Sequence, residues 1–327
     1  MRRMKGLLIP MLVVAGILAG CNGAPAENKV ASTEGASASA DQAAATDWPR
    51  TFKDALGKEF VIKKKPEKIA SLWYFYPEIL VALGEPPTAS TDKEFLSSLS
   101  YLKGKMDSTT ELGDKLSPSV EQILSIEPDY ILATEHHEKH YDALEKVAPV
   151  ITLNSKDIYD NWQYGLRTVA NIIGKEDEAE IVIGNMMNEI TTGREALKSI
   201  QGESVALILS WDGKTYNVLG EGNPVYTLAF DKEQGLGLTA DKTFKGTNNE
   251  FTSFEGMSTV QADHIFLIGD ITKKETLMND LKQSKVWNNL NAVKKGHIYL
   301  MDTSAITGGP LAIEYALQNI KSALIKF

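Results

Sequence analysis

Histidine and glutamate side chains crowd into one short stretch of the chain, and both residue types can bind metal ions. His136 and His140 are four residues apart. In a zinc-protease helix a glutamate directly follows the first histidine, whereas Glu138 stands one place late. His136 and His137 directly follow a predicted strand, where ligands of α/β sheets bind. Contact with a ligand and a solvated charged loop are both consistent with this pattern.

Two other chemistries lack a residue that they need. The sequence Gly213-Lys214-Thr215 resembles the tail of a phosphate loop, but the leading glycine required five residues earlier is Ile208. No Gly-x-Ser-x-Gly nucleophile elbow occurs in the sequence. The only cysteine is Cys21, so neither a disulfide nor a cysteine-based metal site can form within one chain.

Aromatic side chains follow the first predicted strand and the corresponding strand later in the chain. Residues 73–76 are four consecutive aromatics, which cannot all point into a core, so one or two should line a pocket. Two such turns, one in each half of the chain, predict a cleft that closes on a ligand. The predicted ligand contacts are Trp73, Tyr74, Tyr76, His136, His137, Trp211, Lys214 and Tyr216.

Alternating strands and helices must position these turns. Buried strands are predicted at residues 68–72, 129–133 and 150–153, and again at 205–209, 264–268 and 297–301. Ser117 and Pro118 predict the start of one helix, and the segments 252–260 and 286–293 predict two more. The fold class is therefore α/β, with two similar α/β lobes that have mainly parallel sheets and a ligand cleft between them.

The two halves also share charged residues at identical spacing. Glu121 and Asp129 in the first half correspond to Glu255 and Asp263 in the second. Repeated apolar positions are what any helix–strand unit needs, but repeated carboxylates are less easily explained that way.

One long helix, residues 176–200, should join the lobes. Its apolar or small residues alternate four and three apart, which makes a single stripe along a helix. At about 1.5 Å per residue this helix would be roughly 37 Å long, about the width of a domain.

The amino terminus predicts export and a lipid anchor. Arg2, Arg3 and Lys5 precede an apolar run at residues 7–18, and Leu18-Ala19-Gly20-Cys21 resembles a bacterial lipobox. In that family the cysteine becomes the lipidated first residue, here Cys21. The predicted organisation is a lipoprotein signal peptide at 1–20, a flexible tether at 21–47, an N-terminal lobe at 48–174, an inter-lobe helix at 175–201 and a C-terminal lobe at 202–327.

Size and charge narrow the function classes. The chain has 327 residues, 43% of them hydrophobic, which is enough for two ordinary cores. Its net charge of −9 and pI near 5.2 argue against a nucleic-acid partner.

Several short motifs carry a resemblance to a known family. They lie at residues 54–57, 80–84, 116–121, 126–129, 287–293 and 308–310. Each is weak alone, but their order, the lipobox and the long helix together resemble a class III extracytoplasmic substrate-binding protein of an iron–siderophore or cobalamin ABC importer. The resemblance covers residues 51–327.

This resemblance implies a receptor rather than an enzyme. Its ligand would be a ferric siderophore, with iron present only as part of the chelate and no other cofactor or resident metal. The stretch 101–105 and the first aromatic turn are most similar to the ferric hydroxamate branch. The family docks two glutamates, one per lobe, onto arginines of the permease dimer, and the matching positions are Glu121 and Glu255. The expected protein is a monomer held at the extracytoplasmic face of the membrane by lipid on Cys21.

Three alternatives stay open. Haem, cobalamin or another metal chelate could replace the siderophore in the same fold. A lipid-anchored metal-dependent hydrolase could use the histidines at 136–140. A zinc or manganese receptor would need ligands from both lobes, but the second lobe offers only His264 and His297, which lie at strand starts away from the expected cleft.

Replacing the cysteine tests the lipid anchor. Cys21→Ser removes the sulfur that would be acylated, so we expect the protein to leave the membrane fraction. Fold and ligand affinity should stay unchanged, because residues 22–47 offer almost nothing to bury. Cell fractionation and mass spectrometry of the mature protein make the measurement. A Cys21→Ser protein that is still acylated and membrane-bound would refute the lipobox assignment.

Overall fold

The computed structural model describes residues 48–242, 249–251 and 254–325. The signal peptide, Cys21 and the tether, all predicted within residues 1–47, lie outside these described residues. In the described ranges, no helix combines the length and the apolar character needed to cross a bilayer.

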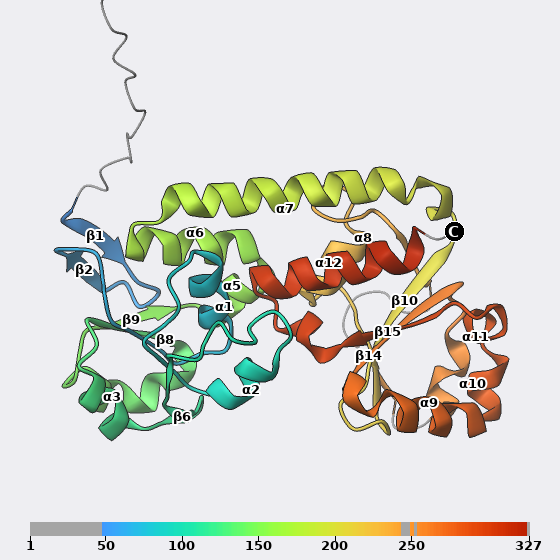
Figure 1. The fold of residues 1–327 in the computed structure, drawn as a ribbon, viewed down its shortest axis with the longest axis horizontal. Helices are drawn as coiled ribbons and strands as arrows, with labels where there is room; N and C mark the ends of the chain where they lie inside the picture. The colour runs from blue at the N-terminus through green and yellow to red at the C-terminus, as the bar shows by residue number, and fades with distance from the viewer. Residues whose placement is uncertain (1–47, 243–248, 252–253, 326–327) are drawn as a thin grey trace, which may run out of the picture. The chain divides into compact units, whose positions relative to one another are not determined.

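The first lobe is built on a five-stranded sheet in which every strand pair is parallel (Figure 1). Its order is β5 (Thr110–Glu111), β4 (Ala89–Ser90), β3 (Ile69–Ser71), β8 (Tyr130–Thr134) and β9 (Val150–Leu153). Two small antiparallel pairs accompany it: β1 (Arg50–Lys53) with β2 (Glu59–Ile62), and β6 (Gly113–Asp114) with β7 (Ser117–Pro118). The helices are α1 (Phe75–Ala82), α2 (Lys93–Ser98), α3 (Val120–Ile126), η1 (Glu135–His140), α4 (Tyr141–Leu144), α5 (Ser155–Asp160) and α6 (Trp162–Ile173).

The second lobe has a mixed sheet. Its order is β13 (Asn249–Phe251), β11 (Tyr216–Val218), β10 (Ser204–Leu209), β14 (His264–Gly269) and β15 (Ile298–Asp302), with β12 (Thr239–Ala240) beside β10. Strands β10, β14 and β15 are parallel, whereas β11 runs antiparallel to β10, and β13 runs antiparallel to β11. The helices are α8 (Pro224–Phe230), η3 (Phe254–Thr259), η4 (Ile271–Lys273), α9 (Lys274–Gln283), α10 (Lys285–Asn289), α11 (Asn291–Lys295), η5 (Thr303–Ile306) and α12 (Pro310–Leu324).

The predicted α/β class with mainly parallel sheets is confirmed, and three local predictions are wrong. Ser117 and Pro118 form β7 instead of starting a helix, and Ser119 caps α3 by accepting from the backbone N–H of Gln122. The helix predicted at 286–293 breaks at Leu290, whose backbone is extended, into α10 and α11. The segment predicted as helix 252–260 contains the short 3-10 helix η3, while 252–253 lie outside the described residues.

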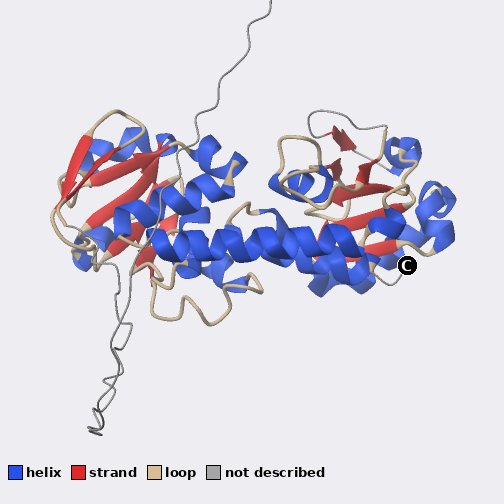
Figure 2. Ribbon diagram, turned by 90° about the horizontal axis from the view of Figure 1, so that it is seen from above, coloured by secondary structure: helices blue, strands red, loops and turns tan. Residues whose placement is uncertain are grey.

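The long helix α7 (Glu176–Ala196) runs from one lobe to the other (Figure 2). Its buried residues are Ala179, Ile183, Met186, Ile190 and Gly193, which form the predicted apolar stripe. The 3-10 helix η2 (Lys198–Ile200) follows it. Buried residues of α7 belong to one continuous apolar core that also contains α6 of the first lobe and α12 of the second. The packing leaves no room for a side chain at Gly193, where a Cβ would lie 2.9 Å from the side chain of Leu236. The two lobes therefore form one compact unit.

The repeated aspartates have the same structural role in both lobes. Asp129 Oδ2 accepts hydrogen bonds from the backbone N–H groups of Glu67 (2.8 Å) and Lys68 (3.0 Å), directly before β3. Asp263 Oδ2 accepts one from the backbone N–H of Ser204 (3.0 Å), the first residue of β10. Each aspartate thus ties the start of its own strand to the start of the neighbouring parallel strand.

The stability lost on removing one of these carboxylates should depend on pH in a specific way. The backbone N–H of Ser204, together with Lys295, lowers the pKa of Asp263 to about 2 from its ordinary 3.8. Because the pKa is lower in the folded state, the stabilisation is present above about pH 4 and is lost as the pH falls toward 2. After allowance for solvent screening, Asp263→Ala should cost about 1–2 kcal/mol of unfolding free energy at pH 7.

Chemical denaturation at pH 7 and pH 3 measures this cost, which should shrink at pH 3. Asp107→Ala, which removes an exposed carboxylate, is the control and should be nearly neutral at both pH values. An Asp263→Ala cost that is the same at pH 3 as at pH 7 would contradict the assigned role.

Candidate functional site

Segments that follow the carboxyl ends of strands in the two lobes contact each other. Tyr159, in α5 after β9, donates its hydroxyl hydrogen bond to the carbonyl of Ile306 (3.4 Å), in η5 after β15. The backbone N–H of Ser100, beyond α2, donates to Ser304 Oγ (3.4 Å). The carboxyl edges of both sheets are therefore on the side where the lobes meet, which is where ligands of open α/β sheets bind.

At this edge of the first lobe an exposed imidazole, His136, covers a buried tryptophan, Trp73. The rings of Trp73 and His136 are stacked, with centroids 4.7 Å apart. His136 is exposed, and its Nε2 lies 3.2 Å from Ser155 Oγ, which ties the turn after β8 to the turn after β9. Tyr74 is partly buried, and burial together with the charge of Glu78 raises the pKa of its hydroxyl.

Three residues predicted to contact ligand are instead fully buried. The hydroxyl of Tyr76 donates to the carbonyl of Ala133 (2.8 Å), and that of Tyr216 donates to the carbonyl of Gly213 (2.8 Å). Each tyrosine therefore satisfies its polar atom inside its own lobe and packs in the core.

The third is His137, which locks the turn after β8. Its Nδ1 accepts from the backbone N–H of Thr134 (3.0 Å), so Nε2 carries the proton and donates to the carbonyl of Lys115 (2.8 Å). Burial lowers the pKa of His137, which keeps the ring neutral. The predictions of ligand contact for Tyr76, His137 and Tyr216 are therefore wrong.

The second lobe presents Trp211 in the turn after β10. Its side chain is 57% exposed, a large value for a tryptophan that no core requires. The carboxylate of Asp212 holds the turn by accepting from the backbone N–H groups of Lys214 and Thr215 (2.7 Å each). These bonds lower the pKa of Asp212, so it stays ionised. Lys214 is exposed beside it.

A small pocket adjoins this turn and adds residues that the sequence reasoning missed. It has a volume of about 140 Å³ and is lined by Trp211, Lys214, Asp270 and Lys273, among others. Thr272 and Lys273 lower the pKa of Asp270 to about 2, so this carboxylate is ionised at neutral pH. Asp270 directly follows β14, so its place after a strand was a signal that the sequence already contained.

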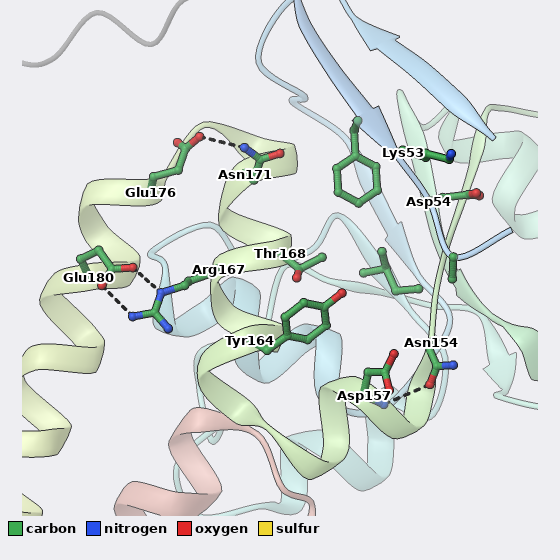
Figure 3. Close-up of a pocket in the computed structure, with 13 residues that line it drawn as sticks. Lys53, Asp54, Asn154, Asp157, Tyr164, Arg167, Thr168, Asn171, Glu176 and Glu180 are labelled. Atoms are coloured by element: carbon green, nitrogen blue, oxygen red, sulfur yellow. Dashed lines mark hydrogen bonds and ion pairs between the residues drawn. The ribbon is translucent and has the colours of Figure 1, made fainter. Parts of the chain in front are cut away.

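A larger cavity lies elsewhere in the first lobe. It has a volume of about 590 Å³ and lies between β1, α5, α6 and α7, and none of the predicted site residues lines it. Figure 3 shows Arg167 of α6 reaching to Glu180 of α7, where Nη2 and Oε2 are 2.9 Å apart. The carboxylate of Asp54, also in the wall, accepts from the backbone N–H groups of Leu56 (3.0 Å) and Lys58 (2.8 Å). Arg167 and Glu180 therefore neutralise each other within the wall, and the carboxylate of Asp54 already has hydrogen-bond partners there.

Ser155, His136 and Glu135 have the composition of a hydrolase triad but not its arrangement. In a triad the serine and the carboxylate contact opposite nitrogens of the imidazole. Here Ser155 Oγ donates directly to Glu135, and both groups lie on the Nε2 side of His136. The carboxylate therefore cannot orient the imidazole as a general base toward this serine.

The histidines at 136–140 also fail to converge on a metal. His137 bonds to the carbonyl of Lys115, whereas His140 Nε2 lies 3.1 Å from the carbonyl of Leu116. Because His136 faces Ser155, the three rings have different partners. This arrangement gives no support to the metal-dependent hydrolase considered from the sequence.

Glu203, His264 and His297 do come together at the opposite edge of the second sheet, with their ligand atoms within 4.8 Å of one another. His264 Nε2 lies 2.9 Å from Glu203, and its Nδ1 lies 3.0 Å from the hydroxyl of Tyr299. The two imidazole rings are stacked, at 4.6 Å and 6°. Two parallel stacked rings cannot both aim an in-plane lone pair at one ion, so this arrangement is structural.

The two repeated glutamates lie on helices, away from the strand ends. Glu121 is exposed in the first turn of α3. Glu255 lies in η3, and its side chain is outside the part of the chain that the structure describes.

Similar proteins agree with this architecture. The chain is 27% identical over 342 residues to a probable siderophore-binding lipoprotein, YfiY, of Bacillus subtilis, covering 100% of this chain and 99% of the relative. It is 27% identical over 277 residues to the iron(3+)-hydroxamate-binding protein FhuD of the same organism, covering 81% and 83%. YfiY and FhuD are thus similar along most of their length.

Solved structures share the fold. FeuA of Bacillus subtilis, a triscatecholate siderophore-binding protein solved with ferri-bacillibactin, has a TM-score of 0.67 at 21% identity, covering 85% of this chain and 98% of FeuA. A periplasmic binding protein of the FhuD fold family from the same organism has a TM-score of 0.70 at 24% identity, covering 84% and 100%. The sequence profile of the periplasmic binding protein family matches residues 69–305, well over half of the chain. The chain therefore belongs to the periplasmic binding protein family.

Proposed function

We propose that this protein is an extracytoplasmic receptor that binds a ferric siderophore between its lobes and delivers it to an ABC importer. The observation that carries the proposal is the pair of aromatic surfaces at the carboxyl edges of two sheets that meet at the joint between lobes. The exposed His136, stacked on the buried Trp73, forms one surface, and the exposed Trp211 with Lys214 forms the other. Tyr74 borders the first. The names of the relatives support the same class of ligand.

The charges favour a hydroxamate chelate over a strongly anionic one. Ferric iron neutralises three hydroxamate groups, whereas three catecholates leave a strongly negative complex, which arginines usually bind. The arginines in the described residues already have partners: Arg50 pairs with Glu176, Arg167 with Glu180, and Arg194 donates to backbone carbonyls. Around Trp211, the pocket is lined by three aspartates and two lysines, so it has no excess of positive charge for a strongly anionic chelate.

Titration with ferric chelates tests the ligand and its place. A ferric hydroxamate should quench tryptophan fluorescence saturably, and Trp211→Ala should weaken binding about tenfold, since a desolvated aromatic contact is worth about 1–1.5 kcal/mol. Trp48→Phe, which changes a tryptophan just before β1 and not in a turn after a strand, is the control and should bind like the wild type.

Three outcomes decide this test. Tighter binding of a triscatecholate or citrate chelate would overturn the hydroxamate preference. Equal affinities of Trp211→Ala and wild type would remove Trp211 from the site. No binding of ferric hydroxamate, catecholate, citrate, haem or cobalamin would overturn the receptor itself.

Delivery would require docking on a permease dimer. We propose that Glu121 and Glu255, equivalent in the two repeats, contact arginines of that permease. In support, Glu121 is an exposed carboxylate that makes no hydrogen bond or ion pair to another described residue. Paired charges of this kind fix register as well as affinity. Lipid on Cys21 would hold the protein, as a monomer, at the outer face of the membrane.

Reversing both charges tests delivery separately from binding. The double variant Glu121→Lys with Glu255→Lys should keep its chelate affinity but lose uptake, while each helix loses only about 0.3–1 kcal/mol. A double variant of Glu59→Lys with Glu314→Lys changes the charge equally, at one exposed position per lobe, and should import normally. Uptake of iron chelate by cells and affinity are measured on the same proteins. Normal uptake by the first double variant would refute the docking assignment.

A further inference from the structure

One carboxyl group is completely buried at the joint between the lobes. Glu78, in α1 of the first lobe, has no exposed surface. Its Oε1 accepts hydrogen bonds from the hydroxyls of Tyr101 (3.0 Å) and Thr307, and its Oε2 accepts one from the backbone N–H of Ala312 (3.2 Å). Tyr101 belongs to the first lobe, whereas Thr307 and Ala312 flank the start of α12 in the second. The carboxyl group therefore bonds across the joint.

The start of α12 lacks a side-chain cap of its own. The N-cap residue is Gly309, which has no side chain, and Pro310 occupies the first helical position. The N–H of Ala312 is one of the donors that an N-cap side chain normally satisfies. Here the acceptor is Glu78, from the other lobe, and a negative charge at this end of a helix is also favoured by the helix dipole.

Two glycines make this approach possible. A Cβ on Gly309 would lie 2.3 Å from Glu78 Oε2. The preceding Gly308 has a φ of +83°, and a Cβ there would lie 2.8 Å from the ring of Tyr159. The backbone before α12 can therefore touch first-lobe side chains only because these two positions carry no side chain.

We propose that Glu78 is a positioning residue, whose carboxyl group caps α12 from the opposite lobe and thereby fixes where the second-lobe surface lies relative to the first. Helix α12 packs on α1, α7, α8 and β15, so its start is the point at which a first-lobe group can hold the second lobe. The consequence for chelate affinity rests on the proposed function, but the consequence for the joint does not.

The stability of the contact between the lobes should depend on pH, because the group that caps α12 is a carboxylic acid buried away from water. Burial raises the pKa of Glu78 to about 7, against the opposing effect of the bonds from Thr307, Tyr101 and Ala312. Among the described residues, Tyr101 bonds to Glu78, and Tyr74 lies near enough for the charge of Glu78 to raise its pKa. Asp302 and Tyr315 of the second lobe lie near Tyr101, and none of these four groups is a cation. Because the folded pKa lies above the ordinary 4.5, the associated stability is full below that value and is lost as the pH rises through 7.

Two substitutions at Glu78 separate the effect of its hydrogen bond to α12 from the effect of its ionisation. Glu78→Gln keeps the shape, an acceptor for Ala312 and a donor for the hydroxyls, but cannot ionise. Glu78→Ala removes the cap. Glu314→Gln, exposed on α12, is the matched control. Thr307→Val removes one hydrogen-bond donor to Glu78 at nearly constant volume, and it takes the place of Glu78→Ala in the experiment if that variant does not fold.

Amide hydrogen exchange, followed by NMR on ligand-free protein, is the direct readout. In Glu78→Ala the amide of Ala312 should exchange at least about tenfold faster, while that of Ile131 in the first sheet stays unchanged. Thr307→Val should give a smaller change at the same amide. The wild type and Glu314→Gln should lose thermal stability between pH 5.5 and 8, and Glu78→Gln should lose less.

Unchanged Ala312 exchange in both Glu78→Ala and Thr307→Val would overturn the cap. An equal loss of stability with pH in Glu78→Gln and wild type would overturn the assignment of this pH dependence to the ionisation of Glu78.

The binding experiment is separate. Glu78→Ala should weaken ferric hydroxamate affinity about tenfold and Glu78→Gln less than about twofold. If the wild type binds no chelate, the proposed function fails, and the exchange arm still decides the cap. Weaker Ala312 protection with unchanged chelate affinity would overturn the claim that the cap positions the site.

Discussion

The unbroken apolar core between the lobes is the constraint on which the rest of the structure depends. It runs from the first sheet through α6 and α7 to α12 and the second sheet, so neither lobe can be displaced without opening packed surface. Close-packed interiors hold discrete arrangements and do not deform continuously. The turns at the carboxyl edges of the two sheets therefore keep a fixed relation, with α7 on one side and the Glu78–Ala312 contact at the joint.

The two lobes repeat one construction and then diverge where the ligand would lie. Asp129 and Asp263 tie strand starts in the same way, which accounts for half of the carboxylate repeat. At the other edge the first lobe offers a stacked Trp73 and His136, whereas the second offers an exposed Trp211 among lysines and aspartates. Similar scaffolds thus present unlike surfaces, which suits an asymmetric ligand that has both apolar and polar faces.

The sequence predicted those features of the fold that depend on the regular spacing of apolar residues. The α/β class, the strand order along the chain and the buried stripe of α7 follow from repeats of apolar residues, and burial of that stripe agrees with the spacing. Trp211, Trp73 and His136 were predicted as ligand contacts because they follow strands; Trp211 and His136 are exposed, whereas Trp73 is buried. The break at Leu290 was missed because apolar spacing continues across it.

Burial in the folded chain accounts for the remaining errors. Tyr76, His137 and Tyr216 are residue types that often bind ligands, and only the folded chain supplies the carbonyls that bury them. Glu78 had no local signal at all, because Thr307 lies 229 residues further along the chain. Hydrogen bonds of this kind depend on tertiary packing, which a periodic pattern does not encode.

The central claim is that one ligand is held by both lobes at the strand ends. A crystal structure of the protein with a ferric hydroxamate bound tests it most directly. The account predicts a chelate in contact with Trp73 or His136 on one side and with Trp211 on the other, and an empty cavity between β1 and α6. A chelate in that first-lobe cavity, or one that touches a single lobe, would contradict it.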